Sequence, residues 1–335
     1  MILLLAATLL LTLPQLADAH GLMQVPVTWY DDGGRIGNQT KYQCNPKCLF
    51  YPENILGPDC GCYWFSNNTE IPGEAVLEPD SPLLTFKYHK KEFDTSKYPW
   101  MAPGTAEVFS PCGIYGGNPK GCPEGDPRKG ACPGAGYAHG PDAREWEFKN
   151  VVVTPYKVGE DIEVIWGINS NHGGGYSYRL CKLPEEGKKG LTEECFQNLT
   201  LPFSGTTQWI QFDNGTRVAF TGIKTSNNTF PHGSEWMRNP VPACRGIGGG
   251  SGDDDAGCPG GLQFAPPVPG VYGFGLHGIK VAFFPNETWD FTFSIVDRVR
   301  LPAGLDPGRY VFSQRWDCEQ TAQVWTSCAD VDLFL

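Results

Sequence analysis

His20 has the most unusual chemical setting in this sequence. Residues 2–13 are almost wholly apolar, and Ala17 and Ala19 are spaced as a signal-peptide cleavage site requires. We therefore predict that residues 1–19 form a secretory signal and that cleavage makes His20 the first residue of the mature chain. At a free N-terminus, the α-amine and the imidazole of one histidine can both donate nitrogen to a single metal ion. His20 is therefore a candidate metal ligand.

A second candidate ligand is His172, which comes shortly after a predicted strand at residues 161–169. Three glycines follow it directly, at positions 173, 174 and 175. They remove side chains from its neighbourhood and would leave the imidazole reachable at the strand end. A reachable histidine suits a metal, although a histidine in a turn that hydrogen-bonds to backbone remains the alternative. The remaining histidines are interpreted as structural or surface residues: His89, His139, His232 and His277.

The acidic net charge argues against two classes of binding partner. The formal net charge is -11, and no run of Lys or Arg is present, which argues against nucleic acid or an anionic membrane surface as the partner. No apolar run after the leader is long enough to cross a bilayer. We expect a soluble, secreted protein.

Export also governs the interpretation of the cysteines. All 13 cysteines follow the predicted signal, so disulfides are the first interpretation, and zinc at the Cys44/Cys48 or Cys60/Cys62 pairs is the disfavoured alternative. Cys318 and Cys328 are candidates to staple the segment between them. Surface glycans are expected at the Asn-x-Ser/Thr sequons, which are Asn38, Asn67, Asn198, Asn214, Asn227 and Asn286.

Short β-type stretches predict the fold. Residues 161–169 place Ile162, Val164, Trp166 and Ile168 on one face of a period-2 pattern, whereas helical periodicity is weak throughout. The other predicted strands are 151–154, 209–212, 217–221, 272–276, 281–284, 291–296, 309–312 and 331–334. This pattern favours an all-β fold, an antiparallel β-sandwich of the immunoglobulin or fibronectin-III type with long disulfide-stapled loops.

A Gly-rich tract at residues 246–261 is either a linker between two domains or a surface loop. Cys244 and Cys258 bracket it, and a disulfide between them would close it as a loop. We therefore expect residues 20–335 to form a single domain.

Three motifs in order carry a family resemblance. They are the leader ending at His20, the run Asn-His-Gly-Gly-Gly-Tyr-x-Tyr-Arg-Leu-Cys around His172, and the closing Gln323-x-Trp325-x-x-Cys328-Ala-Asp-Val. Together they resemble the lytic polysaccharide monooxygenases, and within them the chitin-binding type-4 group. The resemblance implies a β-sandwich whose flat face holds one copper ion in a histidine brace. Its ligands would be the α-amine and side chain of His20 and the side chain of His172.

The resemblance also implies roles for three further residues. Trp325 stands where the family usually has an axial Tyr or Phe, so the sequence departs from the family pattern there. Gln323 matches a glutamine that hydrogen-bonds an oxygen species beside the metal, and Ser170 falls where a small residue shields the distal side. Three neutral nitrogen donors suit copper better than zinc or iron. Rings with a possible role in stacking on sugars are Trp29, Tyr30 and Trp236.

These observations predict a secreted copper monooxygenase that cleaves a β-1,4-linked polysaccharide, chitin ahead of cellulose. Attack on an unactivated sugar C–H bond needs a redox metal, because the protein's own side chains cannot perform it. Its partners would be an insoluble polysaccharide and an external electron donor, and it would act as a monomer. A non-catalytic polysaccharide-binding protein and a histidine-brace copper carrier remain alternatives. A glycosidase would need two carboxylates at a defined separation, and no acidic pair is singled out.

Overall fold

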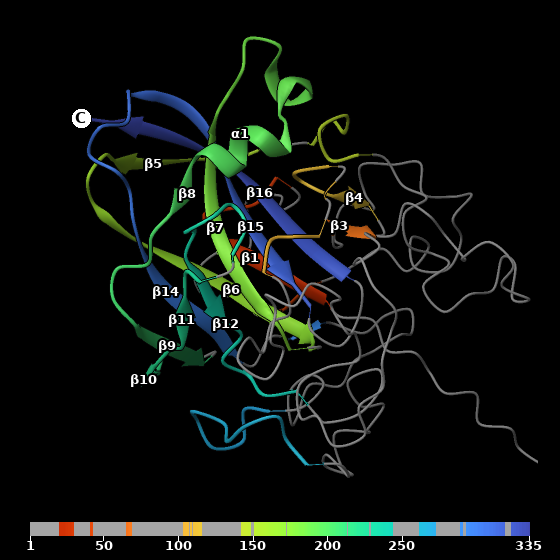
Figure 1. Cartoon of the computed structure of the whole chain (residues 1–335), viewed down its shortest axis with the longest axis vertical. Coiled ribbons are helices and arrows are strands. Elements are labelled where there is room, and N and C mark those ends of the chain that lie inside the picture. The colour runs from red at the N-terminus through yellow and green to blue at the C-terminus, as the bar shows by residue number, and fades with distance from the viewer. Residues whose placement is uncertain are drawn as a thin grey trace, which may run out of the picture.

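The computed structural model (Figure 1) describes a set of ranges separated by gaps. The ranges are 20–29, 41–42, 65–68, 103–106, 108, 110–115, 142–148, 151–171, 173–212, 214–227, 229–243, 261–272, 289–290, 293–318 and 323–335. At some strand positions, including His20, Ser170 and Gln323, only the backbone is described. The predicted signal at 1–19, the predicted strand at 281–284 and almost all of the tract at 246–261 lie outside the described residues.

The described strands form two main sheets. The first sheet has five strands in the order β1-β6-β14-β9-β10, all paired antiparallel. Their bounds are β1 His20–Val25, β6 Asp161–Ser170, β14 Phe293–Arg300, β9 Thr207–Phe212 and β10 Arg217–Thr221. Strand β1 forms one edge of this sheet and pairs with β6. This pairing holds the backbone of residue 20 against the sheet.

The second sheet has nine strands, with β7, β15 and β16 at its centre. The path runs through β11 Lys224–Thr225, β12 Trp236–Arg238, β7 Gly175–Lys182, β15 Gly308–Asp317, β16 Gln323–Phe334, β3 Phe65–Asn68 and β4 Ile114–Tyr115. Off this path, β5 Val153–Lys157 pairs with β16 in parallel and β8 Thr200–Leu201 pairs with β7. Outside the two sheets lie the ribbon of β2 Lys41–Tyr42 with β13 Trp289–Asp290, the 3-10 turn Gly187–Gly190 and helix α1 Glu193–Asn198.

The predicted β-sandwich is confirmed. It differs from the predicted antiparallel arrangement in one pair, β5 with β16, which is parallel. None of the described helices has the length and apolar character needed to span a bilayer.

Strand β6 shows why the alternating pattern predicted a strand. Ile162, Val164, Trp166 and Ile168 are all buried, as expected for the inward face of a half-buried strand. The predicted range of 161–169 falls one residue short of the observed strand. The prediction at 217–221 matches β10, and those at 151–154, 209–212, 291–296, 309–312 and 331–334 fall on β5, β9, β14, β15 and β16.

Strand β7 was not predicted, because seven successive residues from Gly175 to Cys181 are buried. Its outer face is covered by other segments, so the strand has no polar side and no alternation to detect. Arg179 lies on this covered face, where its guanidinium donates to Glu193, to Ser313 Oγ and to the carbonyl of Pro111.

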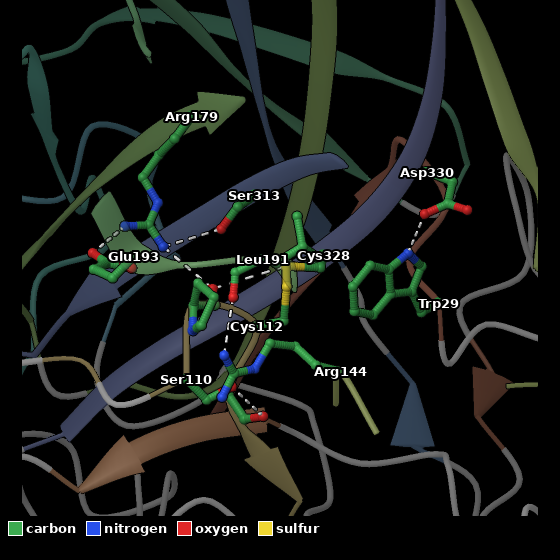
Figure 2. Close-up of a disulfide and its surroundings, with 12 residues drawn as sticks. Trp29, Ser110, Cys112, Arg144, Arg179, Leu191, Glu193, Ser313, Cys328 and Asp330 are labelled. Atoms are coloured by element: carbon green, nitrogen blue, oxygen red, sulfur yellow. Dashed lines mark hydrogen bonds and ion pairs between the residues drawn. A yellow bond between two sulfur atoms is a disulfide. The ribbon is translucent and has the colours of Figure 1, made fainter. Parts of the chain in front are cut away.

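Figure 2 shows this outer layer around the disulfide between Cys112 and Cys328, beside Arg179 with its Glu193 and Ser313 partners. The bridge ties the segment at 110–115 to the middle of β16. A second disulfide joins Cys181 and Cys195 and so fixes α1 to β7. These bridges bear out the prediction of loops stapled by disulfides.

The predicted bridge between Cys318 and Cys328 is wrong. Within the β15–β16 ladder, Cys328 is opposite Ser313 and the last pair is Asp317 with Val324. Cys318 therefore lies about five residues along the ladder from Cys328, which is roughly 16 Å at 3.3 Å per residue. A disulfide needs Cα atoms no more than about 7 Å apart.

The two sheets meet through aromatic rings and one buried carboxylate. The Trp166 ring of β6 lies 4.6 Å from the Tyr176 ring of β7, measured between centroids. Next to them, Asp297 of β14 is fully buried and accepts hydrogen bonds from the hydroxyls of Tyr176 and Tyr178, at 3.0 and 2.7 Å to Oδ2. Gln208 Nε2 donates to its other oxygen at 2.7 Å. Asp297 therefore links the first sheet to the second through the two tyrosine hydroxyls of β7, while Gln208 of β9 donates from within the first sheet.

The pKa of Asp297 is raised to about 6, because desolvation outweighs the hydrogen bonds that favour the carboxylate. An acid with a raised pKa in the folded state adds stability below its unfolded pKa, near 3.8, and loses it as the pH rises through 6. At 1.36 kcal/mol for each pKa unit, this one group lowers the free energy of unfolding by about 3 kcal/mol across that window.

We expect Asp297→Asn to remove this pH dependence, because the amide stays neutral at every pH in the window. Chemical denaturation of wild type and variant at pH 4, 5, 6 and 7 measures the effect. The stability advantage of the wild type over the variant should shrink by about 2 kcal/mol from pH 4 to pH 7, because the unfolded carboxyl is already partly ionised at pH 4. A constant difference at all four values would contradict the shifted pKa.

Candidate metal centre

His20 begins strand β1, and its ladder partner is Ser170, the last residue of β6. The register shifts between His20 and Gly21, which pairs with Ile168. The backbone of residue 20 therefore lies beside the end of β6. His172 follows Ser170 by two residues in the sequence but lies outside the described residues, so its ligand role stays a prediction.

The residues on either side of His172 are firmly held. Asn171 is buried, and its Oδ1 accepts the N–H of Gly173 at 2.8 Å and Asn239 Nδ2 at 2.9 Å. Its own Nδ2 donates to the carbonyl of Val241 at 2.9 Å. The amide of Asn171 therefore fixes the chain immediately before and after residue 172.

Two of the glycines after His172 are required by the backbone. Gly173 and Gly174 have φ values of 67° and 91°, which L side chains rarely adopt. A methyl group at Gly174 would also lie 2.0 Å from the carbonyl oxygen of Asp317 at the end of β15. The glycines are therefore needed for the turn geometry and for close packing against β15. The sequence alone had suggested a different role, which is to keep side chains away from His172.

Sequence reasoning missed Trp316, which touches both segments. Its indole N–H donates to the carbonyl of Gly173 at 2.9 Å. On the other side, a methyl at Gly21 would lie 2.7 Å from Trp316 Cζ3, so the ring lies directly against the start of β1. Extending the predicted strand at 309–312 by its period of two would have placed Trp316 on the same face as Phe312.

Trp325 lies beside this tryptophan. The two are direct cross-strand partners in the β15–β16 ladder, and Trp325 is 2% exposed within the core between the sheets. Gln323 is the first residue of β16 and pairs with Asn68. The structure therefore brings the predicted axial residue next to Trp316 and places Gln323 two residues along the same strand. Their roles beside a metal stay predictions.

The two described tryptophans that were candidates for stacking on sugars do not present their rings to solvent. Trp29 and Trp236 are each 1% exposed. Their indole N–H groups are used inside the protein, on Asp330 Oδ1 at 2.6 Å and Ser234 Oγ at 3.2 Å. The interpretation of these two rings as sugar-stacking surfaces is therefore wrong. Tyr30 lies outside the described residues.

The predicted donor set would fit copper. An amine with two imidazoles is a nitrogen-rich set that copper favours, and the backbone brings residue 20 to the strand end that precedes residue 172. Within the described ranges no cluster of three or more His, Cys, Asp or Glu offers a competing metal site. His232 is exposed, and His89, His139 and His277 lie outside those ranges.

Comparison with known proteins supports the broad class. No family model matches the chain. It is 25% identical over 196 residues to the AA13 family lytic polysaccharide monooxygenase A of Pyricularia oryzae, a match that covers 54% of this chain and 42% of that protein. The chain thus spans less than half the length of this curated relative.

Solved structures with some similarity include two proteins. The AA15 lytic polysaccharide monooxygenase from Thermobia domestica in the Cu(I) state has a TM-score of 0.25 and 15% identity, covering 56% of this chain and 65% of that one. A chitin-binding domain from Burkholderia pseudomallei has a TM-score of 0.34 and 11% identity, covering 95% and 100%. TM-scores this low do not establish a shared fold.

The chain resembles the lytic polysaccharide monooxygenases, as its motifs indicate and as the curated relative confirms. The narrower resemblance to the chitin-binding type-4 group is not confirmed.

Proposed function

We propose that this chain is a secreted, copper-dependent polysaccharide monooxygenase that cleaves a β-1,4-linked polymer oxidatively, chitin ahead of cellulose. The observation that carries the proposal is the pairing of His20 with Ser170 at the end of β6, two residues before His172 in the sequence. The curated relative named as a lytic polysaccharide monooxygenase supports the same class.

In this proposal the α-amine and imidazole of His20 and the imidazole of His172 hold one copper ion. All three nitrogens must be unprotonated to bind. Bound copper supplies one-electron chemistry with oxygen or peroxide, which removes hydrogen from a sugar C–H bond that side chains alone cannot attack. Gln323 would offer a hydrogen bond beside the metal, Trp325 would stand where related enzymes usually have a Tyr or Phe, and Ser170 would be the small residue that shields the site.

The rest of the chain fits a secreted protein in this proposal. Residues 1–19 are removed on export, and residues 20–335 form one domain that works as a monomer with an external electron donor. Three sequon asparagines, Asn198, Asn214 and Asn227, are exposed. They are accessible positions for the proposed glycans.

The test is turnover by mature protein that begins at His20. The protein is loaded with copper, given a reductant and incubated with chitin, cellulose and other insoluble β-1,4-linked polymers, and soluble products are weighed by mass spectrometry. We expect oxidised oligosaccharides that disappear when His172 is replaced by Ala or copper is omitted.

Other outcomes would overturn the proposal in distinct ways. Tight copper binding without oxidised products on any polymer would identify a copper carrier. Sedimentation with a polymer that depends on neither copper nor His172, again without oxidised products, would identify a non-catalytic binding protein.

A further inference from the structure

Trp316 contacts both segments that carry a proposed copper ligand. Its indole N–H donates to the carbonyl of Gly173, and its six-membered ring lies against the backbone of Gly21. Gly21 directly follows His20, and Gly173 directly follows His172. Each contact of the indole is therefore one residue away from a proposed copper ligand.

The indole is held rigidly enough to set a spacing. Trp316 is 1% exposed and its ring lies 5.6 Å from that of Trp166, measured between centroids. In the ladder its cross-strand neighbours are Tyr176 on one side and Trp325 on the other. With large rings on three sides, the indole has no room to change its rotamer. It behaves as a fixed spacer between the two segments.

The two contacts constrain the backbone more than ordinary core packing does. A buried indole N–H needs an acceptor, and here the acceptor is the carbonyl of the residue after His172, at 2.9 Å. Packing alone does not require a residue without a side chain at position 21, where a methyl would meet two ring atoms at 2.7 and 2.8 Å. The first strand lies closer to this ring than any other residue type would allow.

We infer that Trp316 is a positioning residue for the copper site: it fixes the distance between the start of β1 and the turn that carries His172. The inference rests on the proposed function for the identity of the ligands. The positioning acts through the backbone of Gly21 and Gly173.

The experiment compares mature Trp316→Phe with wild type and with Trp29→Phe. Trp29 is the matched control, because it is equally buried and its indole N–H also donates to one acceptor, Asp330. Copper affinity is measured by competition with a chelator, and the Cu(II) spin-resonance spectrum is recorded for each protein. Loss of a partner that orients metal ligands typically costs roughly 10- to 100-fold in affinity. We expect a loss of that size with a changed spectrum for Trp316→Phe, and less than about a twofold change for Trp29→Phe.

A double-mutant cycle with Gly21→Ala tests the second contact. Alone, the added methyl presses on the indole, so we expect it to weaken copper binding as well. Phe lacks the outer edge of the indole and leaves room for the methyl, so Gly21→Ala combined with Trp316→Phe should bind copper no more weakly than Trp316→Phe alone. Additive losses would overturn the inference, because independent sites add.

A copper-free measurement separates this inference from the proposed function. Amide hydrogen exchange of the apo proteins should be faster at residues 21–23 and 173–174 in Trp316→Phe, and unchanged there in Trp29→Phe. If wild type fails to bind copper while this pattern holds, the proposed function falls and the spacing role stands. If exchange at both segments is unchanged, or if Trp316→Phe binds copper as Trp29→Phe does, the inference falls.

Discussion

We expect a single extra residue ahead of His20 to abolish tight copper binding and, with it, the proposed oxidation of polysaccharide. The added peptide bond turns the α-amine into an amide, whose nitrogen lone pair is delocalised into the carbonyl and no longer serves as a ligand. The site then keeps two of its three proposed nitrogens. Because loss of a mere hydrogen bond to a metal ligand typically costs roughly 10- to 100-fold, loss of a ligand should cost at least about 100-fold in copper affinity.

The measurement compares protein that starts at His20 with protein that retains Ala19. Affinity is taken from chelator competition and activity from the yield of oxidised oligosaccharides. One control is an extended protein whose extra residues are then cut off by a site-specific protease, which should restore both values. The other is an added residue after Leu335, which is 77% exposed and should leave both unchanged. Equal copper affinity in the two N-terminal forms would mean that the amine is not a ligand.

Strand β6 could be predicted from sequence because its two faces differ. Strand β6 buries Ile162, Val164 and Trp166 on one side and leaves Asp161 exposed at its start, so its alternation is visible in the sequence. Strand β7 is buried on both sides because Arg179 and its neighbours lie beneath a second layer of chain. That layer includes helix α1, whose Glu193 is 14 residues from Arg179, and distant segments such as the one at Pro111, which is 68 positions from Arg179. The residues of β7 alone do not reveal this cover.

The same limit applies to the site. His20 and His172 could be predicted as ligands because each lies in a short motif that is visible in the sequence. The register that places His20 opposite Ser170 is a long-range property of the β1–β6 ladder. Trp316 shows the limit most clearly, since its partners Gly21 and Gly173 are far from it in the chain. The error over Cys328 has the same origin, because strand register places Cys318 too far from it and the long-range packing of the segment at 110–115 brings Cys112 to it instead.

Gly174 gives a second large prediction, this time on the turn after His172. Its φ of 91° already disfavours any other residue, and a methyl there would lie 2.0 Å from the Asp317 carbonyl oxygen and 3.0 Å from Cys318 Cα. Both obstacles are backbone atoms, which cannot rotate away as the end of a side chain can. We expect Gly174→Ala to lower the free energy of unfolding by about 3 kcal/mol or more, adding the cost of the left-handed conformation to that of overpacking.

Gly205→Ala is the matched control, because Gly205 has a similar φ of 85° but no atom within 4 Å of a methyl placed there. It should lose only about 1 kcal/mol, which is the conformational part alone. Denaturant titration of both variants gives the difference, and chelator competition below both melting temperatures gives the effect on copper. Because the Asp317 carbonyl pushes the turn away from β15, copper affinity should fall in Gly174→Ala and stay at the wild-type value in Gly205→Ala. Equal stability losses would show that the turn moves freely, and then the chain after His172 would not be held against β15.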